Sequence, residues 1–493
     1  MNRKLNRKDF IKLTALGVTG LYFSSCKINE DKKENASTEN ISIEEKENKP
    51  FTVSDDDVIF YQKEDGSYEK LRQGFNKRIQ KFPLVIAECK TTNGIIAAIQ
   101  YAKKNQLPVS IKSGGHCFEG FSSNNNGLVI NLSLMNTVNW IDENTISVQP
   151  GCTLSKLYDT ILPKGKIVPA GSCGGVGVAG LALGGGYGFF SRKYGLTCDS
   201  LADFSMIDSN GKVQTAKDNP DLLWACKGGG NGNFGVISEL TFKLQDAPNH
   251  FTSHRFRLKN ASAEKAELVL QKWFELTKNL PLSCFSAFVL NQKTILILLT
   301  DYEDNSSTVQ QFQKELTSIT ETQSIGKPKA LAESLKVFRG QSAPTYFKNS
   351  SAGLYNSFVD IQPFVKEVLD KVTNTPRMIY QINTLGGNIN NAESEKASAY
   401  PHRKYNYLSE LQTYWENDAE TQKFETAFEE VQTIFRNNNI QTQYRNYPDI
   451  NFEDAQHLYF ADNYERLQVI KQKYDAANLF RYEQSIVGRQ KIG

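Results

Sequence analysis

The sequence predicts an α+β protein with two domains, and three observations support this. The chain has 493 residues, which is more than a single hydrophobic core usually supports. From about residue 53 to 245, short β-like runs alternate with helical patterns, and glycine is frequent. From 246 to 440, polar helical patterns alternate with strand-like runs, and glycine becomes less frequent. We therefore expect one domain at 53–245 and a second at 246–440.

The first 52 residues have the features of an export signal and a tether. Basic residues at 3, 4, 7 and 8 precede an apolar run at 13–23, which is too short to span a bilayer as a mature helix. The run ends in Ser24-Ser25-Cys26, so residues 1–26 resemble a bacterial lipoprotein signal in which Cys26 becomes the lipidated first residue. An ordinary signal peptide is the alternative. Residues 6–12 also resemble a twin-arginine signal with Lys8 in the second basic position.

Residues 27–52 contain mainly Lys, Glu, Asn and Ser, and this composition predicts a disordered tether. Such a linker would hold a folded domain away from a membrane. We therefore expect an exported protein of the cell envelope, in contact with a membrane only through a lipid anchor at Cys26.

The first domain begins with clear local signals. Thr91 and Thr92 suit a helix N-cap, and the apolar residues at 95, 96, 99 and 102 then fall on one helical face. Strands are predicted at 108–111, 128–132 and 202–207, and Asp208-Ser209-Asn210-Gly211 predicts a hairpin turn.

Two glycine-rich stretches interrupt these elements. Ser113-Gly114-Gly115-His116 follows a short apolar run, and its glycines let consecutive N–H groups point at an anion such as a pyrophosphate, beside a histidine. A turn histidine that bonds only its own loop is the alternative. The stretch 169–188 has so many glycines among small apolar residues that we expect neither a stable helix nor an ordinary strand. Something large is expected to lie against its bare backbone.

The second domain is predicted to have a helix at 263–280 and strands at 294–300 and 378–385. Residues 441–490 are expected to return to the first domain, with an amphipathic helix at 453–473.

The composition and motifs exclude several functions. The net charge is +3 and no basic cluster occurs in the folded part, which argues against a nucleic-acid partner. No Gly-Lys-Ser/Thr follows a glycine run, and no Gly-x-Gly-x-x-Gly lies between a clear strand and helix, so a nucleoside triphosphatase or Rossmann dehydrogenase is disfavoured. The cysteines have no Cys-x-x-Cys spacing, and we assign no metal. Structural disulfides would suit an exported protein, but the sequence does not pair the cysteines.

Several longer motifs occur together. Lys-Ser-Gly-Gly-His stands at 112–116, Ala-Gly-x-Cys-x-x-Val-Gly-x-x-Gly at 170–180, Gly-Gly-Gly-Tyr-Gly at 184–188 and Tyr-Arg-Asn-Tyr at 444–447. In this combination the chain resembles the berberine bridge enzyme-like oxidases, a flavoprotein family with the vanillyl-alcohol-oxidase fold. The resemblance implies a PCMH-type FAD-binding domain of two α/β subdomains at 53–245, to which 441–490 returns. It also implies a substrate domain at 246–440 with a large antiparallel sheet backed by helices.

The resemblance also implies which residues bind FAD. They are Lys112, Ser113, Gly114, Gly115, His116, Cys117, Gly171, Cys173, Val176, Gly177, Gly180, Gly185, Tyr187, Gly235, Val236 and Asn446. In the family, the counterpart of His116 bonds the flavin 8α-methyl and that of Cys173 bonds ring carbon 6, so a bicovalent FAD is expected. An imidazole nitrogen and a thiolate can both add to an electron-poor flavin. A small buried thiol is the alternative interpretation of Cys173.

Tyr447 is implied to be the catalytic base, because it matches the second tyrosine of the family's Tyr-x-Asn-Tyr motif. An unperturbed phenol has a pKa near 10, so we expect the site to lower the pKa of Tyr447. A core tyrosine satisfied by one hydrogen bond is the alternative.

The implied activity is transfer of hydride from a C–H beside a hydroxyl to FAD, followed by reduction of O2 to H2O2. We expect a sugar or oligosaccharide substrate, because a surface-tethered bacterial enzyme meets glycans. Aromatic alcohols, alkaloids or polyketide-like compounds, with a quinone or protein as acceptor, are the alternative, and a non-catalytic flavin-bearing protein is a further one. Val176 favours O2, because a larger leucine at this position is linked with poor oxygen use in the family.

Overall fold

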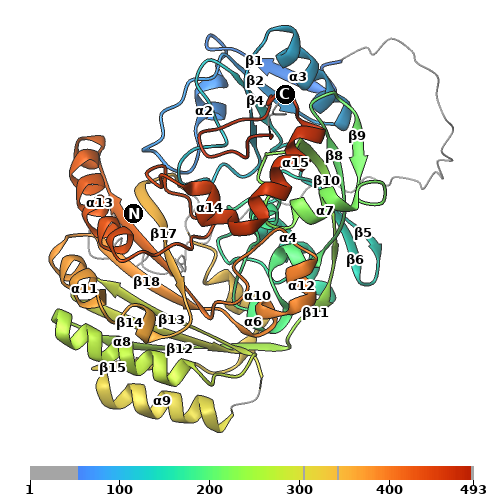
Figure 1. The fold of residues 1–493 in the computed structure, drawn as a ribbon. Helices are drawn as coiled ribbons and strands as arrows, with labels where there is room; N and C mark the ends of the chain where they lie inside the picture. The colour runs from blue at the N-terminus through green and yellow to red at the C-terminus, as the bar shows by residue number, and fades with distance from the viewer. Residues whose placement is uncertain (1–53, 304–305, 341–342, 490–493) are drawn as a thin grey trace, which may run out of the picture.

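The computed structural model describes residues 54–303, 306–340 and 343–489. The predicted export signal at 1–26 and tether at 27–52 lie outside these ranges. Among the described residues, no helix is both long and apolar enough to cross a bilayer. The seven cysteines in these ranges are all free thiols. The blue strands of the first part of the chain and the green-yellow to orange strands of a large sheet lie at opposite ends of the molecule (Figure 1). The two glycine-rich stretches line one cavity together with residues of that sheet.

The first part of the chain forms a four-stranded sheet in the order β1-β2-β4-β3. Its strands are β1 (Val58–Tyr61), β2 (Val85–Cys89), β4 (Leu128–Asn131) and β3 (Val109–Lys112). In the chain, helix α2 (Tyr68–Arg72) lies between β1 and β2, and helix α3 (Thr92–Lys104) lies between β2 and β3. β2, β4 and β3 are parallel, and β1 is antiparallel to β2. The predicted helix is confirmed as α3. The Thr91 side chain caps it by accepting a hydrogen bond from the Gly94 N–H at 3.1 Å.

A five-stranded antiparallel sheet follows, in the order β5-β6-β10-β8-β9. Its strands are β5 (Val138–Asp142), β6 (Thr145–Val148), β10 (Val236–Lys243), β8 (Leu201–Ile207) and β9 (Val213–Thr215). Around it lie α4 (Leu154–Ile161), α6 (Ser191–Tyr194), α7 (Pro220–Cys226) and a short ribbon of β7 (Lys166–Ile167) with β11 (Gln245–Asp246). The predicted hairpin turn joins β8 to β9, and Gly211 has the positive φ of 79° that the turn requires.

The second glycine-rich stretch differs from the expectation at one place. It contains a short helix, α5 (Val178–Leu183), so the prediction that no helix forms within 169–188 is wrong for these six residues. Val178, Ala179, Ala182 and Leu183 are buried in the largest hydrophobic cluster. This packing offsets the cost of the single interior glycine, Gly180, because tertiary contacts rather than intrinsic propensity stabilise most protein helices.

The second domain is built on an eight-stranded antiparallel sheet in which seven strands follow the order β15-β12-β14-β13-β18-β19-β17. These strands are β15 (Thr322–Ser324), β12 (His250–Leu258), β14 (Thr294–Asp301), β13 (Cys284–Asn291), β18 (Met378–Thr384), β19 (Tyr407–Trp415) and β17 (Tyr346–Tyr355), and β16 (Lys329–Ala330) pairs with β12. The helices of this part are α8 (Ala263–Thr277), α9 (Ser307–Ile319), α10 (Leu331–Lys336), α11 (Val365–Asn374), α12 (Ala392–Lys396) and α13 (Thr421–Asn437). The predicted helix and both predicted strands are therefore present, with slightly different ends.

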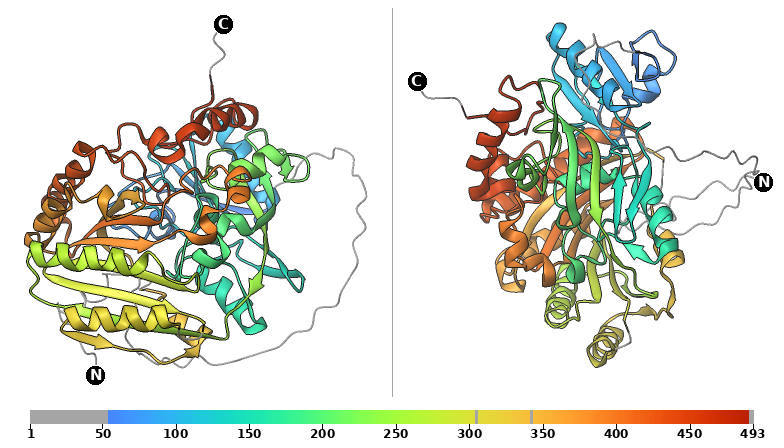
Figure 2. Two further views of the ribbon diagram at one scale, coloured as in Figure 1. Left: turned by 60° about the horizontal axis from the view of Figure 1, so that its bottom comes forward. Right: turned by 90° about the vertical axis from the view of Figure 1, so that its right-hand side faces the viewer.

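The two faces of this sheet have different environments. Helices α8, α9, α11 and α13 lie on the side of the molecule away from the first sheet (Figures 1 and 2). Their apolar side chains and the sheet residues Tyr380, Ile382 and Leu411 form one hydrophobic cluster. The neighbouring strand positions alternate to the other face, which is directed toward the first domain.

The C-terminal segment returns to the first domain, but the helix expected at 453–473 is broken. It consists of α14 (Ala455–Phe460) and α15 (Tyr464–Tyr474), separated by a 3-10 turn. Ala461 at the break has a positive φ of 44°, which an α-helix does not allow. Beyond α15, Phe480 pairs with Val109 of β3.

A buried ionic cluster joins three distant parts of the chain. Lys348 of β17 donates to Glu119, which follows the first glycine-rich turn, at 2.5 Å, and to Asp449 of the C-terminal segment at 2.6 Å. Arg78 donates to the other oxygen of Glu119 at 2.7 Å. Because a buried charge is costly unless it is paired, this cluster holds the three segments in one relative position.

Candidate active site

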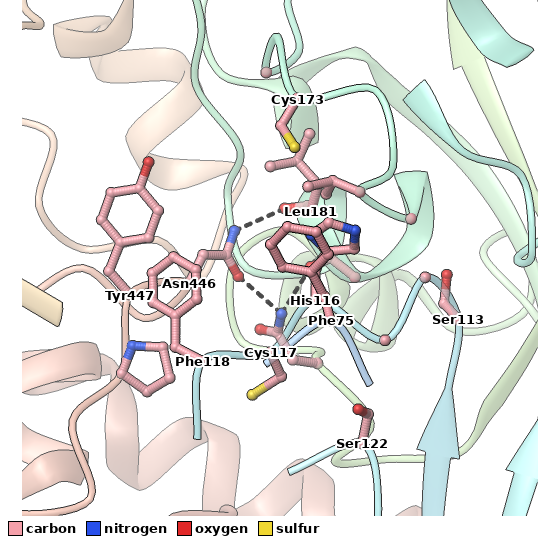
Figure 3. A pocket seen from close by; sticks show the side chains of 18 of the residues that line it. Phe75, Ser113, His116, Cys117, Phe118, Ser122, Cys173, Leu181, Asn446 and Tyr447 are labelled. Atoms are coloured by element: carbon pink, nitrogen blue, oxygen red, sulfur yellow. Dashed lines mark hydrogen bonds between the residues drawn. The ribbon is translucent and has the colours of Figure 1, made fainter. Parts of the chain in front are cut away.

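A cavity of about 370 Å³ lies between the two glycine-rich stretches, the C-terminal segment and the inner face of β17, β18 and β19. Figure 3 shows the side chains of His116, Cys173 and Tyr447 around this space, contributed by three separate segments. Its volume is within the usual range for a ligand site. The cavity is therefore the candidate active site.

The turn after β3 packs directly against the second glycine-rich stretch. A side chain on Gly114 would place its Cβ 2.3 Å from the Gly177 nitrogen, so only glycine fits there. The Ser113 hydroxyl donates to the Pro150 carbonyl at 2.6 Å and fixes the start of the turn. A Cβ on Gly175 would lie 2.7 Å from His116 Nε2, which shows how closely the imidazole approaches the loop that carries Cys173.

Most of the predicted cofactor residues line the cavity. They are Ser113, Gly114, Gly115, His116, Cys117, Gly171, Cys173, Val176, Gly177, Gly180, Tyr187, Gly235 and Asn446, together with the predicted base Tyr447.

Three predicted residues are not part of the cavity wall. The ammonium of Lys112 donates instead to the backbone carbonyls of Leu71 and Gln73, at 2.7 and 2.5 Å. Gly185 packs against the rings of Tyr400 and Tyr444. Val236 is buried among the apolar side chains around the first sheet. These three residues support the walls from behind.

His116 is suited to act as a nucleophile. Its ring stacks on Phe75, with ring centroids 4.3 Å apart. Burial lowers the pKa of His116 to about 4, so the imidazole is neutral at physiological pH and keeps a free nitrogen lone pair.

Cys173 is in a less favourable state for nucleophilic attack. Burial raises the pKa of the Cys173 thiol, although hydrogen bonds from the backbone N–H groups of Gly175 and Val176 act in the opposite direction. The two N–H groups therefore provide the local stabilisation that a thiolate would need.

Tyr447 is held by aromatic rings and by one phenol. Its hydroxyl lies 3.0 Å from the hydroxyl of Tyr187, and its ring stacks on Phe118 with centroids 5.3 Å apart. The expectation that the protein lowers the pKa of Tyr447 is wrong for this structure. Burial raises it well above the usual value, and Tyr187 and Glu410 raise it further.

A polar surface on the inner face of the large sheet is not among the predicted site residues, although the resemblance places 382–388 in pocket-forming strands. It is formed by Asn349 of β17, Gln381 and Asn383 of β18, and Glu410, Gln412 and Tyr414 of β19. These residues occupy every second position of their strands, and the residues between them in β18 and β19, such as Ile382 and Leu411, pack against the helices. That alternation of polar and apolar residues is the sequence signal that could have identified them.

This surface is hydrogen bonded to Tyr187, whose hydroxyl contacts that of Tyr447. The Asn383 amide donates to the Tyr187 hydroxyl at 3.2 Å and to a Glu410 carboxylate oxygen at 3.4 Å. The Asn349 amide donates to the other Glu410 oxygen at 3.3 Å. Burial raises the pKa of Glu410 to about 7, and these amides limit the shift. Glu410 therefore titrates near neutral pH, which is the range in which a general base is most effective.

Two protein-family profiles match the chain. One is an FAD binding domain, over residues 83–217, and the other is "Berberine and berberine like", over residues 443–487. The two matches include both glycine-rich stretches and the segment that carries Tyr447. The chain is also 30% identical to Berberine bridge enzyme-like 16 of Arabidopsis thaliana over 464 residues, which cover 82% of this chain and 84% of that protein.

The chain belongs to the berberine bridge enzyme-like family. It is 29% identical to "Uncharacterized FAD-linked oxidoreductase YgaK" of Bacillus subtilis (strain 168) over 436 residues, 86% of this chain and 95% of that protein. A solved structure of a chitooligosaccharide oxidase superposes with a TM-score of 0.79 at 24% identity, over 88% of this chain and 98% of that one. The berberine bridge enzyme-like chain is thus an FAD-linked oxidoreductase with the predicted PCMH-type fold.

The cavity of this berberine bridge enzyme-like protein fits FAD. Asn231 Oδ1 and Arg445 Nε are buried at its wall without a hydrogen-bond partner in the described residues, as expected of atoms that await a polar ligand. A Cβ on Gly180 would meet no atom within 4 Å, so this glycine faces open space. The residues present can therefore hold the cofactor.

Proposed function

We propose that this protein is an oxidase that oxidises a hydroxyl-bearing carbon of a sugar or oligosaccharide and passes the electrons to O2. The observation that carries the proposal is the row of amide and carboxyl side chains on β17, β18 and β19, which lines the cavity beside the Tyr447–Tyr187 pair. Such a surface offers several donors and acceptors to a polyhydroxyl substrate, whose hydroxyls would otherwise lose their bonds to water. A protein named chitooligosaccharide oxidase shares the fold.

In this proposal, His116 and Cys173 attach the FAD, and the phenolate form of Tyr447 takes the proton of the substrate hydroxyl. Because burial raises the pKa of Tyr447, this form is a minority at neutral pH and increases as the pH rises. FAD, when bound, accepts the hydride of the adjoining C–H, and O2 then takes up two electrons and two protons to give H2O2. Tyr187 orients the Tyr447 hydroxyl through their 3.0 Å contact, and Asn383 fixes Tyr187 in turn.

A second substrate class is favoured by the aromatic side chains at the same cavity. Phe118, Phe347 and Tyr414 line it together with the polar surface, and rings of this kind bind flat apolar molecules. Aromatic alcohols or polyketide-like compounds are therefore the alternative substrates. A quinone or protein is the alternative acceptor, although the small Val176 at the cavity wall supports access of O2.

An anaerobic screen tests the function. The purified protein is mixed without oxygen with mono- and oligosaccharides, aromatic alcohols and amines, and flavin bleaching at 450 nm is followed. We expect bleaching by a saccharide, and formation of one H2O2 per substrate oxidised when air is admitted. Bleaching by aromatic alcohols alone would reject the sugar proposal, and reduced flavin that persists in air would reject O2 as the acceptor.

A Glu410→Gln substitution is expected to make the protein more stable at alkaline pH. The pKa of Glu410 is raised to about 7 in the folded state, so the native protein holds a proton that the unfolded chain releases above about pH 4.5. The free energy of unfolding then falls as pH rises from about 4.5 to 7. Because the folded-state pKa is about 7 and the unfolded one about 4.5, the gain for the glutamine variant approaches about 3 kcal/mol at most above pH 7. Thermal melts from pH 5 to 8 measure the difference, and an equal gain at pH 5 would contradict this origin.

We also propose that the protein is exported and anchored to the envelope through lipidated Cys26. The support is the sequence of residues 1–26 alone. Cys26→Ser should move the protein from the membrane fraction to the soluble exported fraction, with detergent phase partitioning as the readout. An unchanged distribution would favour an ordinary signal peptide or a retained apolar segment.

A further inference from the structure

Arg445 stands out among the buried cations of this protein. It lies between Tyr444 and Asn446 in the motif that ends in Tyr447. Arg445 lines the cavity and is only 4% exposed to solvent. One guanidinium nitrogen donates to the Tyr482 hydroxyl at 2.9 Å. The guanidinium carbon lies 5.6, 5.3 and 5.5 Å from the ring centroids of Phe121, Tyr459 and Tyr482. Aromatic faces surround the charge, but they do not neutralise it.

The other buried Lys and Arg side chains of the described residues all have strong acceptors. Lys166, Lys348, Arg403 and Lys471 each pair with a carboxylate within 2.7 Å. Arg192 has no carboxylate, but its guanidinium donates to four backbone carbonyls at the junction of the two domains.

Arg445 has neither kind of compensation in the part of the chain that the structure describes. No carboxylate lies within ion-pair distance of it, and its Nε–H is buried without an acceptor. Removing a charge from water costs several kcal/mol unless an opposite charge is close. A cation that remains unpaired at a cavity wall therefore indicates that its counter-ion arrives with a ligand.

The position of Arg445 indicates which part of the ligand carries this counter-ion. Among the described residues of the cavity wall, Arg445 is the only Lys or Arg, and Glu410 is the only acid. Glu410 is on the large sheet, where the substrate is expected. The guanidinium lies instead beside the segment that follows the turn with Ser113-Gly114-Gly115, 5.6 Å from the ring centroid of Phe121. It also lowers the pKa of the Cys117 thiol, although burial raises that pKa more strongly. This turn presents backbone N–H groups suited to an anion.

We propose that Arg445 is the counter-ion of the FAD pyrophosphate. This inference deepens the cofactor site and rests on FAD as the cofactor, but it is independent of the substrate and of the electron acceptor. The pyrophosphate carries the only oxygens of oxidised FAD that are ionised at neutral pH. Its charge neutralises the guanidinium, and one of its oxygens accepts the Nε–H.

The first test uses ³¹P NMR of the flavin-loaded protein, which reports on the phosphates independently of turnover. Arg445→Gln should shift the pyrophosphate resonances from their wild-type positions, and Arg445→Lys, which keeps the charge, should shift them less. Arg192→Gln is the matched control, because it also removes a buried cation without a carboxylate but lies outside the cavity wall. Resonances that do not move in Arg445→Gln would overturn the proposal.

The second test measures affinity in a His116→Ala/Cys173→Ala background, in which FAD is held without covalent bonds. Arg445→Gln should raise the Kd for FAD by about 10- to 100-fold, the value of a charge-assisted hydrogen bond. Arg445→Lys should recover part of this loss. If the Kd is unchanged and only the flavin reduction potential falls, the guanidinium faces the isoalloxazine ring and the proposal is wrong. None of these readouts requires a substrate, so a failed substrate screen leaves the test intact.

Discussion

Tyr447→Phe should slow anaerobic reduction of the bound flavin by about 10²- to 10⁴-fold, the usual effect of losing a general base. The substitution removes one oxygen and keeps the ring that stacks on Phe118. The fold and the flavin absorption spectrum should therefore be retained. Hydride leaves far more readily from an alkoxide than from an alcohol, so the loss should be in the reductive half-reaction. Stopped-flow measurement at 450 nm with the best substrate gives the rate.

Two further variants separate Tyr447 from its neighbours. Tyr187→Phe removes the hydroxyl that lies 3.0 Å from that of Tyr447 and should slow reduction less than Tyr447→Phe, because it only orients the base. Glu410→Gln removes a carboxylate that raises the pKa of Tyr447, so the rise of the reduction rate with pH, which reports ionisation of the base, should move to lower pH. If Glu410→Gln causes the large slowing and Tyr447→Phe does not, Glu410 is the base. If Tyr447→Phe slows only the reoxidation of the flavin by O2, Tyr447 acts in the oxidative half-reaction and is not the base for substrate oxidation.

The flavin should remain on the denatured protein and should be released only when both attachment residues are removed. Wild type, His116→Ala and Cys173→Ala should each give a yellow acid precipitate, because one bond is enough to retain the cofactor. The double variant should release all of its flavin to the supernatant. Absorbance of pellet and supernatant measures the partition, and mass spectrometry of flavin peptides identifies the bonds.

A control variant separates attachment from general damage to the site. Cys117→Ala removes a thiol one residue from His116 that also lines the cavity, and it should leave both attachments intact. Wild-type protein that loses all of its flavin on precipitation would show that neither bond forms. Loss of flavin from Cys173→Ala alone would show that His116 is not an attachment site.

Local patterns predicted the parts of the site that depend on neighbouring residues. The turn at 113–117 could be recognised because glycine, a preceding strand and a histidine are adjacent in the sequence. The cap at Thr91 and the hairpin at 208–211 were predictable for the same reason, since each is decided within a few residues. The family resemblance supplied the remaining cofactor residues, and most of them line the cavity.

The features that could not be predicted depend on distant segments. The pKa of Tyr447 is set by burial and by Tyr187 and Glu410, which come from other elements, so the motif alone gave the wrong direction. Lys112 is the last residue of β3, next to the turn, yet its ammonium donates hydrogen bonds to two backbone carbonyls at the end of α2. The missing counter-ion of Arg445 becomes visible only when all neighbours are present. Charge compensation is a property of the folded molecule rather than of a motif.

The ionic cluster around Lys348 has a consequence for how the chain can be divided. Its bonds to Glu119 and Asp449 span 229 and 101 residues of sequence, so the two domains and the C-terminal segment each contribute one of these three charges. A chain cut before Asp449 keeps a buried ammonium with half of its compensation, and breaking such a buried pair costs about 3–5 kcal/mol. That cost is a large part of the stability of an ordinary protein. We therefore expect a chain that lacks the C-terminal segment to be markedly less stable than the whole chain.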